Sequence, residues 1–303
     1  MDAGLQVRDL HVRYTDGTWA LRGVDLDIGA GASVAVVGES GSGKTSLLKA
    51  LLGLLPDGTE ITGRATFAGH DLLAATPPER RRLLGSVVGY VGQDPYASNN
   101  PLLNVGRNVA ESWRAKGLRV GAERIADTLQ RLAIPEPRRT MQRHPHQWSG
   151  GMLQRGSIAA ATALAPGLLL ADEPTSALDA ELADRCLDDL LSTAPTALVV
   201  THDLRLAARH VDMIAVCYAG RLVEVGRRDA LLDRPQHPYT RALLAALPVR
   251  GGGLPRPLPG TPPDLRAPDS GCAFAARCDC SVPACRSRVP SLVDGVACDA
   301  IAS

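Results

Sequence analysis

Apolar and polar residues alternate in three stretches near the start of the chain. A period of two is found in residues 5–14, 24–28 and 61–69, and it is typical of strands with one face against a core and the other in water. Sheets of that kind are usually antiparallel. The pattern therefore predicts an antiparallel β subdomain built from half-exposed strands.

Five shorter runs are almost entirely apolar, which predicts strands buried on both faces. Helical stretches separate them, as a parallel, doubly wound sheet requires. Residues 95–156 carry helical patterns and no strand pattern, so we expect an all-helical insertion in an α/β framework. The buried runs are residues 32–37, 87–92, 168–171, 197–200 and 213–216.

A glycine-rich turn joins the first buried run to a helical pattern at residues 46–55. A strand, such a loop and a helix, in that order, are the context in which the pattern G-x4-G-K-[ST] binds phosphate, because backbone N–H groups converge at the helix N-terminus. The chain has three lysines and thirty arginines, and it keeps Lys44 where a compact ammonium would reach the β- and γ-phosphates. The Thr45 hydroxyl would bind Mg2+. The predicted cradle residues are Gly38, Ser40, Gly41, Gly43, Lys44 and Thr45.

Polar side chains follow three of the other buried runs. In a parallel α/β sheet the ligand lies outside the carboxyl ends of the strands. We therefore expect these side chains to share one edge of the sheet with the phosphate loop. They are Gln93, Asp172, Glu173 and His202.

The overall composition weakens the case for two classes of function. Net charge is +1, from 33 basic and 32 acidic residues, which gives no electrostatic reason to expect a nucleic-acid partner. The N-terminus lacks a basic stretch followed by an apolar core, so no export signal and a cytoplasmic protein are expected. The longest mostly apolar stretch, residues 158–171, is too short to span a bilayer. Any membrane role is expected to come through a partner.

These motifs together resemble those of the ATP-binding subunits of ABC transporters, from about Leu5 to the C-terminus. The loop from Gly38 to Thr45 resembles Walker A, and the strand that ends at Asp172, followed by Glu173, resembles Walker B with its catalytic glutamate. The remaining motifs follow the order found in the family. They are the Q-loop residue Gln93, the signature Ser149-Gly150-Gly151-Met152, the D-loop Ser176-Ala177-Leu178-Asp179 and the switch residue His202.

The resemblance implies an ATPase that uses ATP and Mg2+. Asp172 would hold the metal, together with Thr45 and Gln93, and Glu173 would polarise the water that attacks the γ-phosphate. His202 would donate a hydrogen bond to that phosphate as charge develops, and Gln93 would touch both metal and water. The resemblance also implies the fold of a P-loop NTPase of the ABC type.

By the same resemblance, one chain holds two halves of different nucleotide sites. Ser149, Gly150 and Gly151 would serve the nucleotide held by the Walker A loop of a second ATPase subunit, in a head-to-tail dimer, and a paralogue is favoured as that subunit. Asp179 of the D-loop is also expected to bind nucleotide. The helical insertion and the Q-loop would receive a cytoplasmic helix of a membrane permease. Two permease subunits, an extracytoplasmic solute-binding protein and a peripheral position on the cytoplasmic face of the membrane are implied.

Base selection needs an aromatic surface beside the phosphate loop, since the loop grips any nucleotide. Tyr14 ends the first predicted strand and resembles the aromatic residue with which the family stacks adenine. Trp19 is the second candidate for this adenine platform.

Residues 234–244, which include His237-Pro238-Tyr239-Thr240, narrow the resemblance to importer ATPases for dipeptides, oligopeptides and nickel. A nickel or metal-chelate importer ATPase is therefore an alternative to a peptide importer ATPase. A soluble ABC protein acting on nucleic acid or ribosomes is less favoured, because this chain has one cassette and a neutral charge balance. Two features depart from the family: Trp148 stands where leucine is usual, and Gly156-Ser157 is an unusually small pair.

The predicted domains are an ATPase domain at residues 1–247, with its helical insertion at about 95–156, and a tail at 248–303. The tail begins with a proline-rich stretch and holds five of the seven cysteines. Four thiolates on loops suit an iron-sulfur cluster, and their order resembles the cysteine tail of peptide-importer ATPases that hold a [4Fe-4S] cluster. Zinc and free thiols stay open as alternatives. The predicted ligands are Cys272, Cys278, Cys285 and Cys298, with Cys280 as an additional thiol.

Overall fold

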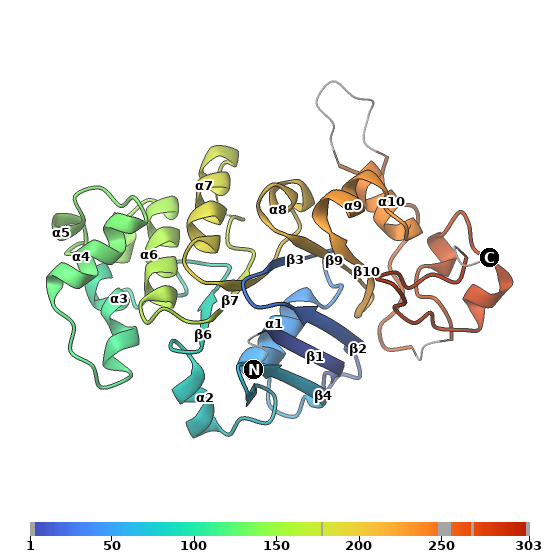
Figure 1. Cartoon of the computed structure of the whole chain (residues 1–303), viewed down its shortest axis with the longest axis horizontal. Helices are drawn as coiled ribbons and strands as arrows, with labels where there is room; N and C mark the ends of the chain where they lie inside the picture. Colours follow the sequence, from blue (N-terminus) through green and yellow to red (C-terminus); the bar gives the residue numbers. More distant parts are fainter. Residues whose placement is uncertain (1–3, 177, 248–255, 268–269, 301–303) are drawn as a thin grey trace. The chain divides into compact units, whose positions relative to one another are not determined.

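The computed structural model describes residues 4–176, 178–247, 256–267 and 270–300 (Figure 1). They form two compact units, each assembled from stretches that are separate in the sequence. The first unit contains Gly4, Ile28–Ser33 and Phe67–Thr201, and the second contains Leu5–Asp27, Val34–Thr66 and the described residues from His202 onward. Residues 248–255 of the predicted proline-rich stretch and Ala177 of the D-loop motif lie outside the described part.

The second unit contains a parallel strand pair that carries the phosphate loop. β3 (Ser33–Val37) pairs with β9 (Met213–Tyr218) in parallel, with Val34 opposite Met213. All four residues from Val34 to Val37 are buried, as expected for a strand covered on both faces. The helix α1 (Lys44–Leu52) follows the loop and ends at Gly53, whose left-handed backbone suits a C-cap. The predicted order of strand, loop and helix is confirmed.

One strand of this unit was not predicted. β10 (Arg221–Arg227) pairs with β9 in antiparallel fashion through a two-residue turn at Ala219 and Gly220. Both turn residues have positive φ, 50° and 80°, as in the tight turns that match the twist of a hairpin. Such turns usually have Asn-Gly or Asp-Gly at these two positions. Here the first residue is alanine, so the sequence gives no sign of the turn.

A second sheet of this unit arises from the alternating stretches. β1 (Leu5–Arg13) lies between β2 (Trp19–Ile28) and β4 (Glu60–Phe67), and its buried residues recur at Leu5, Val7, Leu10 and Val12. The other elements of the unit are α8 (Leu204–His210), α9 (Arg228–Asp233) and α10 (Pro238–Ala245), with short 3-10 turns at Ala275–Arg277 and Pro283–Arg286.

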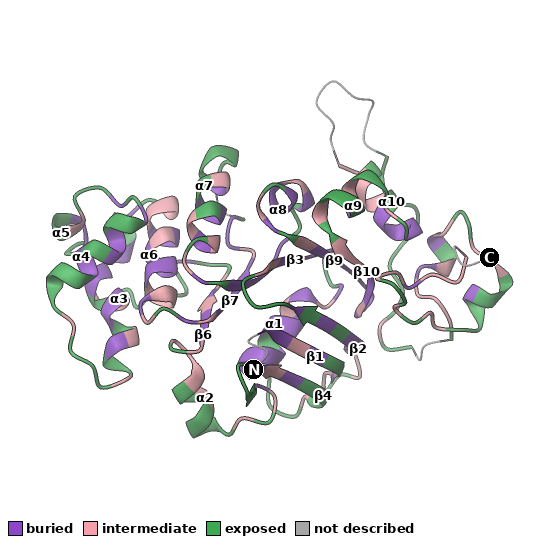
Figure 2. Cartoon of the chain, viewed as in Figure 1, coloured by how far each residue is buried: buried purple, intermediate pink, exposed green. Residues whose placement is uncertain are grey.

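The first unit contains three parallel strands in the order β6, β7, β8. They are β6 (Val88–Val91), β7 (Leu168–Asp172) and β8 (Thr196–Val200). Every residue of β7 (Figure 2) and of β8 is buried. This pairing confirms the parallel core predicted from the continuous apolar runs. The other elements outside the helical insertion are β5 (His70–Asp71), α2 (Pro77–Leu83) and α7 (Ala180–Leu191).

The helical insertion packs amphipathic helices against one another. The helix α3 (Val105–Arg114) buries Val105, Val109 and Trp113, which lie on one face at helical spacing. Exposed polar residues cover the opposite faces, shown in green in Figure 2. The remaining members are α4 (Ala122–Arg131), α5 (Pro137–Thr140), the 3-10 turn η1 (Pro145–Gln147) and α6 (Gly150–Thr162).

The two departures from the family pattern compensate for each other inside this insertion. Trp148 is 3% exposed and donates its indole N–H to Thr140 O at 3.1 Å. A Cβ placed on Gly156 would lie 3.3 Å from Cζ3 of Trp148, so the missing side chain at 156 provides the space that the large indole fills. Ser157 also has a partner, because its Oγ accepts a hydrogen bond from Asn99 Nδ2 at 3.0 Å.

The described tail has little regular structure and is fixed mainly by individual hydrogen bonds within the second unit. Leu265 O accepts from Trp19 N at 3.0 Å, and Gly295 O accepts from Val225 N at 2.7 Å. Of the helices in the described part of the chain, none has both the length and the apolar character needed to cross a bilayer.

Candidate functional site

The phosphate loop in the second unit has the backbone shape that a phosphate cradle needs. Gly43 is the N-cap of α1 with φ 105°, a left-handed conformation that favours glycine. A Cβ at Gly38 would clash with the carbonyl oxygen of Cys217, and one at Gly43 would clash with that of Ala20. These two glycines therefore let the loop turn tightly against neighbouring backbone and leave the helix N-terminus directed into the loop.

Lys44 lies on the inside of this loop. Its side chain is buried, and Nζ donates to Gly38 O at 2.8 Å and to Glu39 O at 2.9 Å. Ser42 Oγ lies at 3.5 Å from the same ammonium. The arrangement places a fixed positive charge among converging backbone N–H groups, which suits the phosphates of a nucleotide.

The aromatic candidates differ in their surroundings. Tyr14 is half-buried, and its hydroxyl hydrogen-bonds with Ser46 Oγ on α1 at 2.8 Å. Trp19 instead packs edge-on against His11, with ring centroids 6.1 Å apart, and lies under the Arg13 guanidinium at 5.3 Å. The bond to Ser46 holds Tyr14 beside the phosphate-loop helix, so Tyr14 stays the preferred prediction for the adenine platform.

In the first unit, the end of β7 carries the predicted carboxylates. Asp172 is 4% exposed, and Glu173 follows it with a left-handed φ of 47° and with its N–H donating to Val200 O at 2.8 Å. A positive φ in a non-glycine residue is strained and needs surrounding structure to hold it. The strand end therefore fixes the backbone conformation at Glu173.

Gln93 belongs to the same edge. The parallel register places Val91 opposite Ala171, so the residues that follow β6 and β7 leave the sheet together. Gln93 is exposed there. Tyr90 lies within the electrostatic influence of this edge: burial first and the Asp172 carboxylate second raise the pKa of its hydroxyl. Carboxylate and amide oxygens, as Asp172 and Gln93 offer at this edge, are of the type that Mg2+ prefers.

Two predicted residues act as helix caps in the structure. Ser149 is the N-cap of α6, and its Oγ accepts from Met152 N at 3.3 Å. Asp179 is the N-cap of α7, and its Oδ1 accepts from Leu182 N at 3.0 Å. Each cap satisfies a backbone N–H that a helix start leaves open and so fixes the first turn of its helix. His202 is exposed and directly precedes Asp203, the N-cap of α8.

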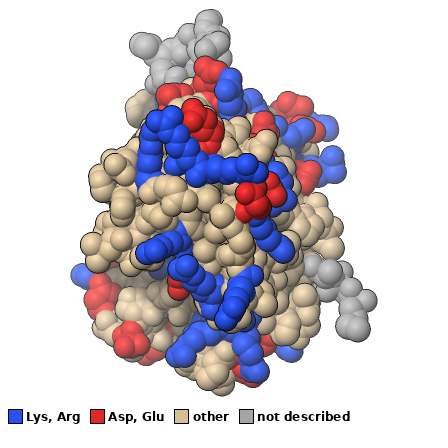
Figure 3. Space-filling model, turned by 90° about the vertical axis from the view of Figure 1, so that its left-hand side faces the viewer, with Lys and Arg blue, Asp and Glu red and all other residues tan. Residues whose placement is uncertain are grey.

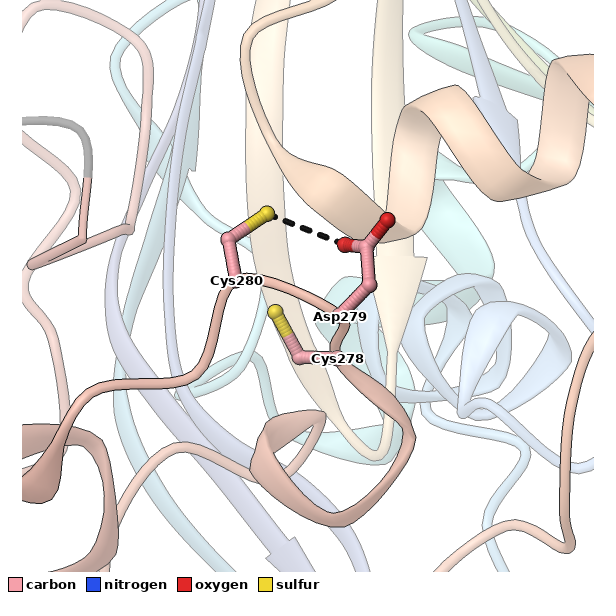
Figure 4. A group of neighbouring side chains, drawn as sticks. All are labelled: Cys278, Asp279 and Cys280. Carbon is pink, nitrogen blue, oxygen red and sulfur yellow. Dashed lines mark hydrogen bonds between the residues drawn. The ribbon is translucent and has the colours of Figure 1, made fainter.

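The described tail includes all four predicted cluster ligands, Cys272, Cys278, Cys285 and Cys298. The group of metal-ligating side chains that the described residues bring within 4.8 Å of one another is Cys278, Asp279 and Cys280. Figure 4 shows Cys280 directed at Asp279, to which its thiol donates at 3.0 Å. Cys272 instead neighbours Cys285, whose carbonyl oxygen accepts from Cys272 N at 2.7 Å. Burial, the largest cause, raises the pKa of Cys278 to about 11.

Three residues of the phosphate-loop region were missed by sequence reasoning. Glu39 N donates to Tyr239 Oη at 2.9 Å, and the Glu39 carboxylate pairs with Arg277 Nη1 at 2.7 Å. The motif around Tyr239 was noted only as a family marker. A local pattern could not have found Arg277, which is 238 positions from its partner in the sequence.

Comparison with known proteins agrees with this geometry. The ABC transporter family matches residues 21–176, and the family described as the oligopeptide/dipeptide transporter C-terminal region matches residues 223–285. The dipeptide transport ATP-binding protein DppD of Bacillus subtilis is 40% identical over 293 residues, which cover 92% of this chain and 87% of that protein.

Two further proteins extend the comparison. Escherichia coli DppD, also a dipeptide transport ATP-binding protein, is 38% identical over 95% of this chain and 92% of its own. A solved structure of the ATP-binding cassette MJ0796, a dimer bound to ADP and Pi, superposes with a TM-score of 0.66 at 28% identity, covering 74% of this chain and 98% of that one. The chain therefore belongs to the ABC transporter family of ATP-binding proteins, in the branch that carries the oligopeptide/dipeptide transporter C-terminal region.

Proposed function

We propose that this chain is the ATP-hydrolysing subunit of an importer that takes up dipeptides or oligopeptides through a membrane permease. The observation that carries the proposal is the strand end at Asp172 and Glu173, in a chain that also has the oligopeptide/dipeptide transporter C-terminal region. A nucleotide-binding protein without transport would not need that region. Relatives at about 40% identity are named as dipeptide transport proteins, which supports peptides over nickel.

Different residues of this chain have different roles in ATP hydrolysis. The phosphate loop and Lys44 bind the β- and γ-phosphates. Asp172, Thr45 and Gln93 would hold Mg2+, which would supply charge neutralisation at the reacting phosphate. Glu173 accepts the proton of the water that attacks the γ-phosphorus, and ADP leaves with the electrons of the broken P–O bond.

A second ATPase subunit completes each site in this proposal. Ser149 and the glycines after it begin a helix whose N-terminus offers donors to phosphate, and by family resemblance that phosphate belongs to the opposite subunit. We favour a paralogue as this partner in a head-to-tail dimer. The importer would also include two permease subunits and an extracytoplasmic solute-binding protein.

The helical insertion supports the contact with the permease. Leu102 is 84% exposed and Tyr96 is 50% exposed, and they lie nine and three positions after the Q-loop residue Gln93. An exposed apolar pair on a polar segment suits a partner surface better than solvent. The same segment, residues 95–156, has ten basic and four acidic residues, and Figure 3 shows lysine and arginine side chains gathered on this face. Such a charge suits a position beside anionic lipid headgroups on the cytoplasmic face of the membrane.

The proposal is tested by ATP-dependent peptide uptake into vesicles that contain this chain, its paralogue, the permease and the solute-binding protein. Glu173→Gln keeps the size of the side chain but accepts protons poorly, so we expect hydrolysis to fall about 100-fold or more while ATP binding is kept. Peptide uptake should fall with it. Uptake of nickel chelates in place of peptides would refute the peptide assignment, and normal turnover by the variant would remove Glu173 from catalysis.

The iron-sulfur cluster stays a prediction. Cys278 and Cys280 lie within 4.8 Å of each other beside Asp279, and Cys272 lies near enough to Cys285 and Cys298 for their charges to raise its pKa. Iron and acid-labile sulfide, measured on protein purified without oxygen, test the cluster directly. About four of each per chain would support it, whereas one zinc per chain or no metal would exclude it.

A further inference from the structure

A buried arginine of the tail reaches directly to the phosphate loop. Arg277 is 8% exposed, and its guanidinium forms a two-pronged ion pair with Glu39, with Nη1 to Oε2 at 2.7 Å and Nη2 to Oε1 at 3.0 Å. Glu39 is the second residue of the loop that begins at Gly38. Paired bonds of this kind fix orientation as well as distance, because the planar guanidinium matches the carboxylate.

The other contacts of Arg277 leave its guanidinium little freedom to move. Nε donates to Pro259 O at 2.6 Å, and Nη1 also donates to Tyr218 Oη at 3.0 Å. The guanidinium carbon lies 5.6 Å from the centre of the Tyr218 ring and 5.7 Å from that of Phe274. Four of the five N–H donors that an arginine offers are therefore used in bonds of defined direction. The surrounding contacts hold the Arg277 guanidinium in the orientation that its ion pair with Glu39 requires.

A second element reaches the same residue from α10. Tyr239 is fully buried, and its hydroxyl accepts from Glu39 N at 2.9 Å. The Tyr239 ring lies 4.4 Å from the Tyr218 ring and 5.4 Å from the Phe274 ring, centre to centre. The backbone of Glu39 is thus held through Tyr239, and its side chain through Arg277, by one aromatic cluster.

Glu39 in turn holds the phosphate-binding lysine. Lys44 Nζ donates to the carbonyl oxygens of both Gly38 and Glu39. A change in the direction of the Glu39 peptide would therefore move one of the two carbonyl groups that orient the Lys44 ammonium. The contacts run in a continuous chain from the tail, through Arg277 and Glu39, to the group that meets the β- and γ-phosphates.

We infer that Arg277 is a positioning residue for the phosphate loop, and that the C-terminal tail is part of the nucleotide-binding machinery. Without the Arg277–Glu39 pair, the loop keeps its sequence but loses the contact that fixes its second residue. Binding then has to order the loop, which weakens the affinity for ATP. The inference depends on ATP binding alone, so it stands whichever solute the importer carries.

The test measures the dissociation constant for a fluorescent ATP analogue with the full-length chain. Wild-type binding is established first. Arg277→Met keeps the apolar stem but removes the charge, and we expect it to weaken binding about tenfold, the scale of a lost partly buried bidentate pair. Glu39→Gln should give a similar loss. If both act through the pair, the double variant Glu39→Gln/Arg277→Met should lose no more than one of them alone.

Three comparisons separate positioning from general damage to the tail. Arg266→Met removes another ion pair of the tail, the exposed one to Asp16 at 3.1 Å, and should leave ATP affinity within about twofold. Arg277→Lys keeps the charge without the fork, and should recover part of the affinity. In the assembled importer, the loss from Arg277→Met should appear in KM for ATP, with kcat nearly unchanged.

Thermal unfolding of each variant is recorded so that affinities are compared where all the chains are folded. Wild-type affinity in a folded Arg277→Met protein would overturn the inference. Additive losses in the double variant would also overturn it, because they would mean that Arg277 and Glu39 act separately.

Discussion

The helical insertion and the C-terminal tail are each stabilised by a different kind of contact. The insertion consists of amphipathic helices whose apolar faces meet, and the Trp148 ring fits closely over Gly156 of its signature helix. The described tail contains short 3-10 turns and isolated β-bridges, and it is fixed by particular side chains, above all Arg277 and the rings around it. A surface of packed helices tolerates substitutions of its exposed residues and is suited to binding a partner protein. A network of hydrogen bonds and ion pairs fixes the positions of particular side chains and is suited to supporting a binding site.

The largest expected effect is on ATP-driven uptake, from a substitution at Leu102, an exposed leucine of the insertion. Leu102→Asp replaces an apolar side chain that is 84% exposed, so the fold should be unaffected while the proposed permease contact gains a buried charge. We expect ATP-driven uptake to fall about 100-fold, with ATP binding unchanged. Leu118→Asp, at another exposed leucine of the same insertion, serves as the control. Equal losses in both variants would mean that Leu102 has no special contact.

The next effect concerns acid stability near the tail. His237 is 1% exposed, and burial first, then the charge of Arg241, lower its pKa from 6.5 to about 4. Between these values the unfolded chain binds a proton that the folded chain does not, so the free energy of unfolding rises with pH and is lost as pH falls from 6.5 towards 4. The loss should reach about 3 kcal/mol.

Asparagine provides the matched variant for this titration. His237 is the N-cap of α10, and its Nδ1 accepts from Tyr239 N at 3.0 Å, a bond that an asparagine oxygen can replace. Urea unfolding between pH 4 and 7 should therefore show a smaller slope with pH for His237→Asn than for wild type. Parallel pH profiles of the two proteins would show that His237 does not titrate in this range.

A smaller effect tests the tight fit in the insertion. Gly156→Leu would press against the Trp148 ring, which lies 3.3 Å from where the new Cβ would be, and should cost about 1–3 kcal/mol of stability. The double variant Trp148→Leu/Gly156→Leu should regain part of that loss, since it restores the usual leucine at 148. Gly121→Leu has open space around it and gives the baseline. A double variant that is less stable than Gly156→Leu would refute the compensation.

The smallest effect is at the predicted adenine platform. Tyr14→Ala should weaken ATP binding by about 1–2 kcal/mol, the worth of one aromatic stacking contact. Tyr14→Phe keeps the ring and loses only the bond to Ser46, so its effect should be smaller. The readout is the ATP dissociation constant, with Trp19→Ala in parallel. A loss with Trp19→Ala and none with Tyr14→Ala would move the platform to Trp19.

The contrast also explains which features the sequence could predict. β3, the phosphate loop and α1 follow from a buried run, glycine spacing and helical periodicity, which all act over a few residues. The insertion follows from helical periodicity alone. β10 was missed because alanine occupies a turn position with positive φ, and α2 (Pro77–Leu83) because none of its residues is buried.

The tail escaped prediction for a different reason. Its main contacts join residues far apart in the sequence, such as Arg277 and Glu39, and no periodicity encodes them. The sequence alone also does not determine whether Cys278 and Cys280 belong to the same ligand set. Composition showed that something must fix so short a segment, but only the structure identifies the arginine that does so.

The most direct test of the account compares one variant from each region in a Glu173→Gln background, where ATP binds without turnover. Arg277→Met should bind ATP about tenfold more weakly and still co-purify with the permease, whereas Leu102→Asp should bind ATP normally and fail to co-purify. This opposite behaviour is what a positioning tail and a partner-binding insertion predict. Normal ATP affinity in Arg277→Met, combined with loss of the permease, would contradict the account.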